Sequence, residues 1–118
     1  MPAKRMTDDE RQAAAALRQS VGCNLRRVRE VLGLAQGEFG RRAGLAINTY
    51  NMVENGEKLP SIMTAIALCD AHQLTLDYVF RGDTSDLPPR IRMAIDAIDI
   101  ARATQPTQER SRKVRAKG

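Results

Sequence analysis

Apolar residues recur at intervals of three or four along most of the chain, a spacing that predicts helices. The pattern is clear in the segment that contains Leu25, Val28 and Leu32, and Gly33 is expected to end that helix. Runs typical of strands are nearly absent. The sequence therefore predicts an all-α protein. Shorter helices are expected at 36–43, 47–55, 61–71 and 76–81.

The N-terminal end carries a helix-start signal. Thr7 and Glu10 stand three residues apart, as in a capping box, and Ala13 to Leu17 are strong helix formers. This helix could stop at Ser20 or continue past Gly22. We treat 1–20 as a helical extension and 21–83 as the central domain.

A last helix is expected to begin at Pro89, within an amphipathic segment at 84–104. Its residues Ile91, Ile95 and Ile98 form an apolar stripe, which is the best candidate for an interface between two copies of the chain. The alternative is that the stripe folds back onto its own domain. Pro106 is expected to end order, leaving a disordered tail at 105–118.

The composition argues against an enzyme or a metal protein. His72 is the one histidine, and the two cysteines fit no zinc spacing, so we expect no metal and no cofactor. His72 itself is expected to cap a helix or to be exposed. No apolar run is long enough to cross a membrane, and no secretory signal is visible. A cytoplasmic protein, associated with the nucleoid, is the simplest expectation.

The positive charge is concentrated at the C-terminal end. The segment 105–118 holds five basic residues and one acidic residue, whereas 22–82 holds seven basic and six acidic residues. A basic segment suits a polyanionic partner such as DNA, although it could equally be a solvated terminus.

Three stretches of the central domain resemble the Cro/C1-type (XRE) helix-turn-helix family. They are the segment 29–40 (REVLGLAQGEFG) with Gly44 and Leu45 after it, the segment 50–56 (YNMVENG), and the segment 76–83 (LDYVFRGD). The resemblance implies a lambda-repressor-like fold of five helices that binds double-stranded DNA, with the helix at 47–55 in the major groove. It also implies a buried ion pair between Arg29 and Glu54, and a homodimer on paired half-sites.

The helix at 47–55 has an outer face that could read bases. Asn48 is suited to adenine, and Ile47 or Met52 to a thymine methyl group. The predicted base-reading residues are Ile47, Asn48, Asn51 and Met52. The predicted phosphate-contacting residues are Gln36, Arg41, Arg42, Thr49, Asn55 and Lys58.

The sequence departs from the family at several positions. Ala35 and Ala46 stand where Ser or Thr would cap the two helices, and Gly37 weakens the first of them. No Lys or Arg lies between Arg42 and Lys58. We therefore expect a transcriptional regulator of bacterial or phage type, such as a repressor, and keep a protein-interaction adaptor or an antitoxin as the alternative.

Overall fold

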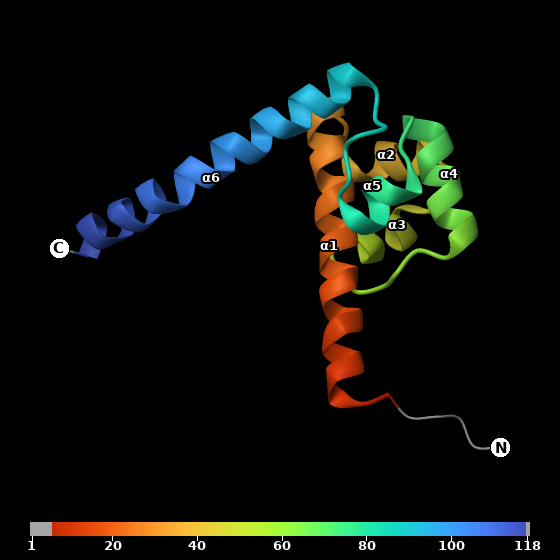
Figure 1. Cartoon of the computed structure of the whole chain (residues 1–118), viewed down its shortest axis with the longest axis horizontal. Helices are drawn as coiled ribbons and strands as arrows, with labels where there is room; N and C mark the ends of the chain where they lie inside the picture. Colours follow the sequence, from red (N-terminus) through yellow and green to blue (C-terminus); the bar gives the residue numbers. More distant parts are fainter. Residues whose placement is uncertain (1–5, 118) are drawn as a thin grey trace.

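The computed structural model describes the backbone of residues 6–117 and the side chains of residues 6–103. This part of the chain is all-helical, as predicted, and contains no strand. Figure 1 shows a group of short helices on one side of a long helix, while the last helix leaves on the other side. The helices are α1 (Asp8–Leu32), α2 (Gln36–Arg42), α3 (Ile47–Glu54), α4 (Ile62–His72), α5 (Leu76–Arg81) and α6 (Pro89–Lys117).

Helix α1 is one uninterrupted helix of 25 residues. The predicted capping box is confirmed, because Thr7 accepts from the backbone of Glu10 and the Glu10 carboxylate accepts from the backbone of Thr7. The helix continues past Gly22 and ends at Gly33, which adopts the left-handed conformation. The predicted N-terminal extension and the central domain therefore share one helix.

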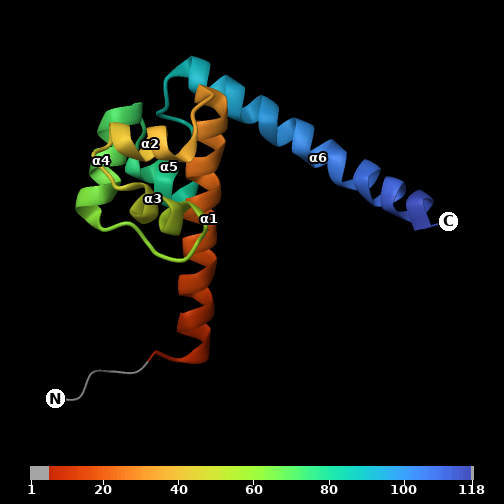
Figure 2. The same ribbon diagram turned by 180° about the vertical axis from the view of Figure 1, so that it is seen from behind.

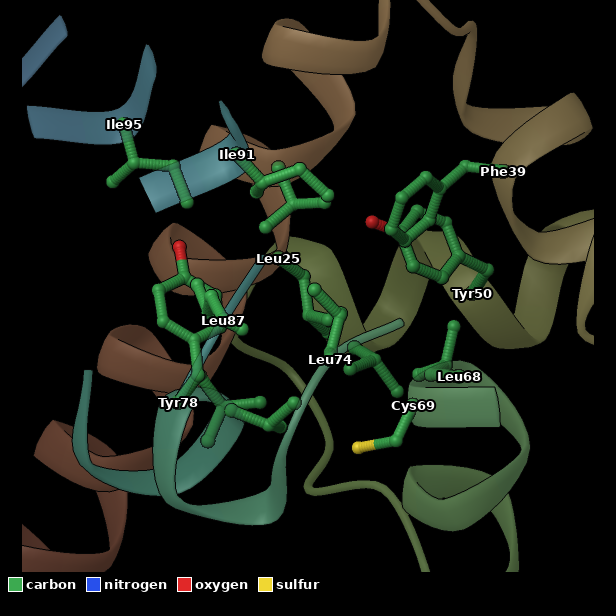
Figure 3. Packing of buried hydrophobic residues seen from close by; sticks show 14 residues of the cluster. Leu25, Phe39, Tyr50, Leu68, Cys69, Leu74, Tyr78, Leu87, Ile91 and Ile95 are labelled. Carbon is green, nitrogen blue, oxygen red and sulfur yellow. The ribbon is translucent and has the colours of Figure 1, made fainter. Parts of the chain in front are cut away.

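The core lies between the C-terminal half of α1 and the helices α2 to α5, with the start of α6 closing it (Figure 3). Asn24 of α1 donates its side-chain amide to the carbonyls of Tyr78 and Val79, at 3.2 and 3.1 Å. Tyr78 in return donates its hydroxyl to the Asn24 carbonyl at 2.6 Å. These buried bonds fix α5 against α1.

The predicted dimer stripe on α6 is largely part of this core, which corrects the interface prediction. Ile91 and Ile95 are 5% and 0% exposed, and Ile98 is half-buried. The first turns of α6 lie across the end of α1, where two ion pairs continue the contact. These join Arg27 to Asp99 and Arg102 to Glu30. The stripe is buried against its own domain because removing apolar side chains from water is favourable and the end of α1 offers a nearby apolar surface.

The prediction of a disordered tail at 105–118 is also wrong for 105–117, because α6 continues to Lys117. Pro106 cannot donate a backbone hydrogen bond, but the residues after it include Gln, Glu, Arg, Lys and Ala, which favour a helix. Gly118 lies outside the described residues. Both views place the C-terminal end of α6 on the side of α1 opposite α2, α3 and α4 (Figures 1 and 2).

Helix α4 is less buried than its apolar sequence suggests. Ala65, Leu68 and Cys69 face the core, whereas Ile62, Met63 and Ile66 are 59%, 75% and 42% exposed. Eight of the eleven residues of this helix are apolar and they occur on every side of it, so their spacing could not tell the inner face from the outer one.

The buried face of α4 also carries His72, which is neither a cap nor exposed. Its ring stacks on the Phe39 ring, with centroids 3.7 Å apart and planes 4° from parallel. Its Nε2 lies 2.9 Å from the Phe39 carbonyl oxygen, so a neutral ring with the proton on Nε2 donates to that carbonyl. His72 thus joins α4 to α2.

We expect acid to weaken the fold through His72. Burial, with a smaller contribution from Arg42, lowers the pKa of His72 below its ordinary value of 6.5. The unfolded chain therefore takes up this proton near pH 6.5 while the folded protein resists it. Stability should be constant above that pH and fall as the pH drops from about 7 towards 5.5.

Urea unfolding at pH 7.5, 6.5 and 5.5 measures this loss. The variant His72→Phe keeps a flat ring beside Phe39 and cannot take up a proton, so its stability should change less over the same range. An identical pH profile for the two proteins would contradict the role given to His72.

Candidate nucleic-acid interface

Helices α2 and α3 form a compact unit around a tight turn. Gly44 has a φ of 79°, in the left-handed region that glycine adopts without strain. Gly40 faces Tyr50 so closely that an added Cβ would lie 2.7 Å from the Cβ of Tyr50. A small residue at position 40 therefore allows the close crossing of α2 and α3.

Helix α3 has one face in the core and one in solvent. Tyr50, Val53 and Glu54 are buried. Asn48 and Asn55 are exposed on the other side, together with Met52, whose exposed fraction is 42%. The outward side chains follow the helical phase expected from the sequence.

The other two predicted base-reading residues lie at the edge of this outer face. Ile47 is 54% exposed and leans towards α2, where its Cδ1 would lie 3.1 Å from a Cβ added at Gly37. Asn51 is half-buried, and its Oδ1 is shielded from solvent without a hydrogen-bond partner among the described residues. Asn51 is thus the least accessible of the four predicted base-reading residues, and Ile47, Asn48 and Met52 are exposed.

The inner face of α3 is held by the carboxylate of Glu54. Arg29 donates from Nε to Oε1 at 2.7 Å and from Nη2 to Oε2 at 3.0 Å, a two-bond pairing. Tyr50 donates its hydroxyl to Oε1 at 2.8 Å, and Gln36 donates its amide to Oε2. The pair implied by the resemblance is therefore in contact, and it joins α1, α2 and α3.

This network keeps Glu54 charged although its side chain is fully buried. Burial on its own would raise the pKa of Glu54, but the hydrogen bonds from Arg29, Gln36 and Tyr50 outweigh it and lower the pKa. The bond to Glu54 raises the pKa of Arg29. Desolvation and the same carboxylate raise the pKa of the Tyr50 hydroxyl, which stays protonated as a donor.

The predicted phosphate-contacting residues differ in how far their side chains are exposed to solvent. Asn55 and Lys58 are exposed beside the end of α3, and Thr49 is half-buried. The Gln36 amide is directed at Glu54 rather than at solvent.

Two further predicted phosphate contacts lie near the end of α2. Arg41 and Arg42 are exposed, and both pair with Glu38, the second at 2.9 Å. A surface pair of this kind contributes little to stability and leaves the guanidinium groups within reach of an anion.

Arg18 and Arg26 of α1 also lie near the end of α3, and sequence reasoning did not single them out. Arg18 donates to the Gly56 carbonyl at 3.3 Å. Arg26 lies 3.7 Å from Glu54, and its side chain is 43% exposed. The two arginines are eight positions apart, a spacing that places residues on the same side of one helix. Sequence reasoning left open whether the helix continues past Gly22, so it did not place Arg18 and Arg26 on one helix.

The starts of α2 and α3 have no side-chain caps, as the sequence predicted. Ala35 and Ala46 occupy the cap positions without a side-chain hydrogen bond. Both helices are short, so their stability depends on packing, of α3 against α1 and of α2 against α3 and α4, and on the Glu54 network.

This arrangement, a short helix, a tight turn and a second helix with an exposed polar face, defines a helix-turn-helix protein. Residues 25–79 match the family model described as helix-turn-helix, which is of the Cro/C1 (XRE) type that these residues resemble. That family consists of DNA-binding regulatory domains rather than enzymes. No curated protein and no solved structure matches the chain significantly. Among the described residues, no helix is long and apolar enough to span a membrane, and no cluster of metal-ligand side chains occurs.

Proposed function

We propose that this chain is a sequence-specific DNA-binding regulator of transcription that reads the major groove with α3. The observation that carries the proposal is the division of α3 into a locked inner face and a free outer face. Glu54 and Tyr50 fix the helix from within, while Asn48 and Met52 remain in solvent. A rigid helix that presents amide and apolar side chains has the groups needed to contact base edges.

The proposed reading uses different chemistry for bases and for phosphates. Asn48 pairs with adenine through its amide, and Met52 contacts a thymine methyl group nearby, so the half-site should contain A·T pairs. Asn55 and Lys58 lie at and beyond the C-terminal end of α3, and Arg41 and Arg42 lie in the last turn of α2. These four residues would set the register of α3 through phosphate contacts. This scheme agrees with the apolar character of α3, because apolar groups gain nothing from phosphates.

Replacing Asn48 by Ala should weaken binding to the cognate site by about 1–3 kcal/mol and relax the preference at one base position. Random DNA should be bound almost as before, because phosphate contacts supply that affinity. Titrations with selected and random duplexes, at one fixed salt concentration, measure both effects.

The matched control is Asn55→Ala, which removes the same amide from the residue that caps the C-terminal end of α3. If Asn55 contacts phosphate, this variant should weaken cognate and random DNA by similar factors. Replacing the contacted thymine by uracil removes only the methyl group, so it should mimic Met52→Ala and add little to it. If both asparagine variants keep the preference for the cognate site, base reading by α3 is contradicted.

A protein-docking role is the second candidate, because Ile47 and Met52 of α3 are 54% and 42% exposed. Exposed apolar side chains also mark protein interfaces. This role predicts that the variants of Asn48 and Met52 leave DNA affinity unchanged and abolish binding to a protein partner.

A further inference from the structure

The N-terminal half of α1 contacts the turn that follows α3. In Figures 1 and 2 the segment after α3 begins beside α1 and then runs to α4, while the first turns of α1 project beyond the short helices. Arg18 is half-buried, and its Nε donates to the Gly56 carbonyl oxygen at 3.3 Å. Arg18 lies before the residues 25–79 that match the family model, so the helix-turn-helix unit itself does not account for this contact.

Gln19 covers the same glycine from the next position on α1. A Cβ added at Gly56 would lie 2.5 Å from Nε2 and 2.9 Å from Oε1 of Gln19, so this side chain lies directly over the glycine. Gly56 is buried and has a φ of 79°, in the left-handed region. A residue without a side chain at position 56 therefore permits both the turn and the close approach of Gln19.

Gly56 stands in a turn whose neighbouring side chains face solvent. The backbone N–H groups of Glu57 and Lys58 donate to the Met52 carbonyl oxygen at 2.9 and 3.2 Å, which folds the chain back onto the end of α3. Asn55 and Lys58, on either side of Gly56, are exposed. The contacts from α1 thus act on a turn that carries two of the proposed phosphate-contacting residues.

We propose that Arg18 and Gln19 are positioning residues, which hold this turn in the conformation in which Asn55 and Lys58 contact DNA phosphates. This role rests on the proposed DNA binding and adds the N-terminal half of α1 to it. A turn that is ordered before binding loses less conformational entropy when it meets a phosphate, so affinity rises. Because phosphate contacts carry no sequence information, cognate and random DNA should gain equally from this support.

Two substitutions of Arg18 separate its hydrogen bond from its charge. The amide nitrogen of Gln is as many bonds from the backbone as Nε of Arg, so Arg18→Gln keeps a donor for the Gly56 carbonyl and removes the charge. Arg18→Met removes both the donor and the charge, with a side chain as long as that of Gln. Support of the turn by the hydrogen bond predicts that binding tolerates Gln and does not tolerate Met.

Arg18→Met should weaken binding to cognate and to random duplexes by about two- to tenfold each, as expected for the loss of one hydrogen bond. The log–log slope of affinity against salt should also become shallower, by up to about 0.9, because the contact of Lys58 is weakened. Arg18→Gln should bind almost as the wild type does. The matched control is Arg11→Met, which removes an exposed arginine seven residues earlier on the same side of α1 and should leave binding unchanged.

A double-mutant cycle tests whether Arg18 acts through the turn. Lys58→Ala removes a phosphate contact that Arg18 is proposed to support, so adding Arg18→Met to it should cause a smaller loss than in the wild type. Adding Arg18→Met to Arg41→Ala, at the end of α2, should multiply the two separate losses, because these sites share no partner. Losses that multiply in both pairs would contradict the positioning role.

Amide hydrogen exchange reports on the turn without DNA. The N–H groups of Glu57 and Lys58 should exchange faster in Arg18→Met than in the wild type, and Arg18→Gln should restore their protection. Unchanged protection of the buried Leu25 in α1 would show that the fold is intact. Gln19→Ala uncovers Gly56 and should act in the same direction, so it replaces Arg18→Met if that variant fails to fold.

A wild-type chain that binds no duplex would overturn the proposed function, and the positioning role on DNA with it. If the wild type binds DNA, unchanged affinity in Arg18→Met would overturn the positioning role alone. Equal losses in Arg18→Gln and Arg18→Met, or in Arg11→Met and Arg18→Met, would overturn it as well, because they would trace the effect to charge.

Discussion

Replacing Arg29 or Glu54 by alanine should lower the free energy of unfolding by about 3–5 kcal/mol. The side chain of Glu54 is fully buried and that of Arg29 is 18% exposed, so each variant leaves the other charge in a poorly solvated position. Glu54→Ala also removes the acceptor of Tyr50 and Gln36. Small domains have only about 5–15 kcal/mol of stability, so either variant should lose a large part of it.

The matched control for this prediction is Arg26→Ala. Arg26 lies on the same helix and near the same carboxylate, but at 3.7 Å and with a 43% exposed side chain. Its loss should cost no more than about 1 kcal/mol, as for other exposed pairs. Urea unfolding monitored by circular dichroism gives all three values. Equal stability of Arg29→Ala, Glu54→Ala and Arg26→Ala would show that the network does not hold α3.

Signals that lie within a few residues of one another predicted most of the helices. Thr7 with Glu10, and Thr75 before α5, are cap residues whose hydrogen bonds are local. Gly33 and Gly82 end helices because they adopt the left-handed conformation. Nothing outside these segments is needed to read such signals, which explains why the sequence was sufficient.

The candidate site depended on more than local pattern. Helical phase predicted that Asn48 and Met52 face outward, but the contact between Arg29 and Glu54 spans 25 residues and came from the family resemblance. Periodicity identifies an apolar face and does not identify its partner. The stripe of Ile91 and Ile95 was therefore read as an interface between copies, although it packs against its own domain.

His72 shows a similar limit of sequence reasoning. Its partner Phe39 lies 33 residues earlier, and no pattern along the chain links a histidine to a distant carbonyl group. The two arginines at the end of α2 were predicted to contact phosphate, but the sequence did not show that they would share Glu38. Long side chains choose among several neighbours, and only the folded geometry decides between them.

Gly22→Ala should be the most damaging of the glycine substitutions. A Cβ at position 22 would lie 2.2 Å from the carbonyl oxygen of Glu54 and 3.0 Å from that of Val53. Both atoms belong to the backbone, so no side chain can rotate away, and α3 must move off α1. Glycine within a helix costs about 1 kcal/mol relative to alanine, so its presence in the middle of α1 needs a packing reason of this kind.

We expect Gly22→Ala to lower the free energy of unfolding by about 3 kcal/mol, the upper end of the usual cost of overpacking. The matched control is Gly37→Ala, where the added Cβ would meet only the end of the flexible Ile47 side chain, at 3.1 Å. There the gain in helix propensity, about 1 kcal/mol, should leave stability unchanged or raised. Thermal unfolding of both variants measures the difference. Similar melting temperatures for the two would mean that the close approach of α1 to α3 does not limit the residue at position 22.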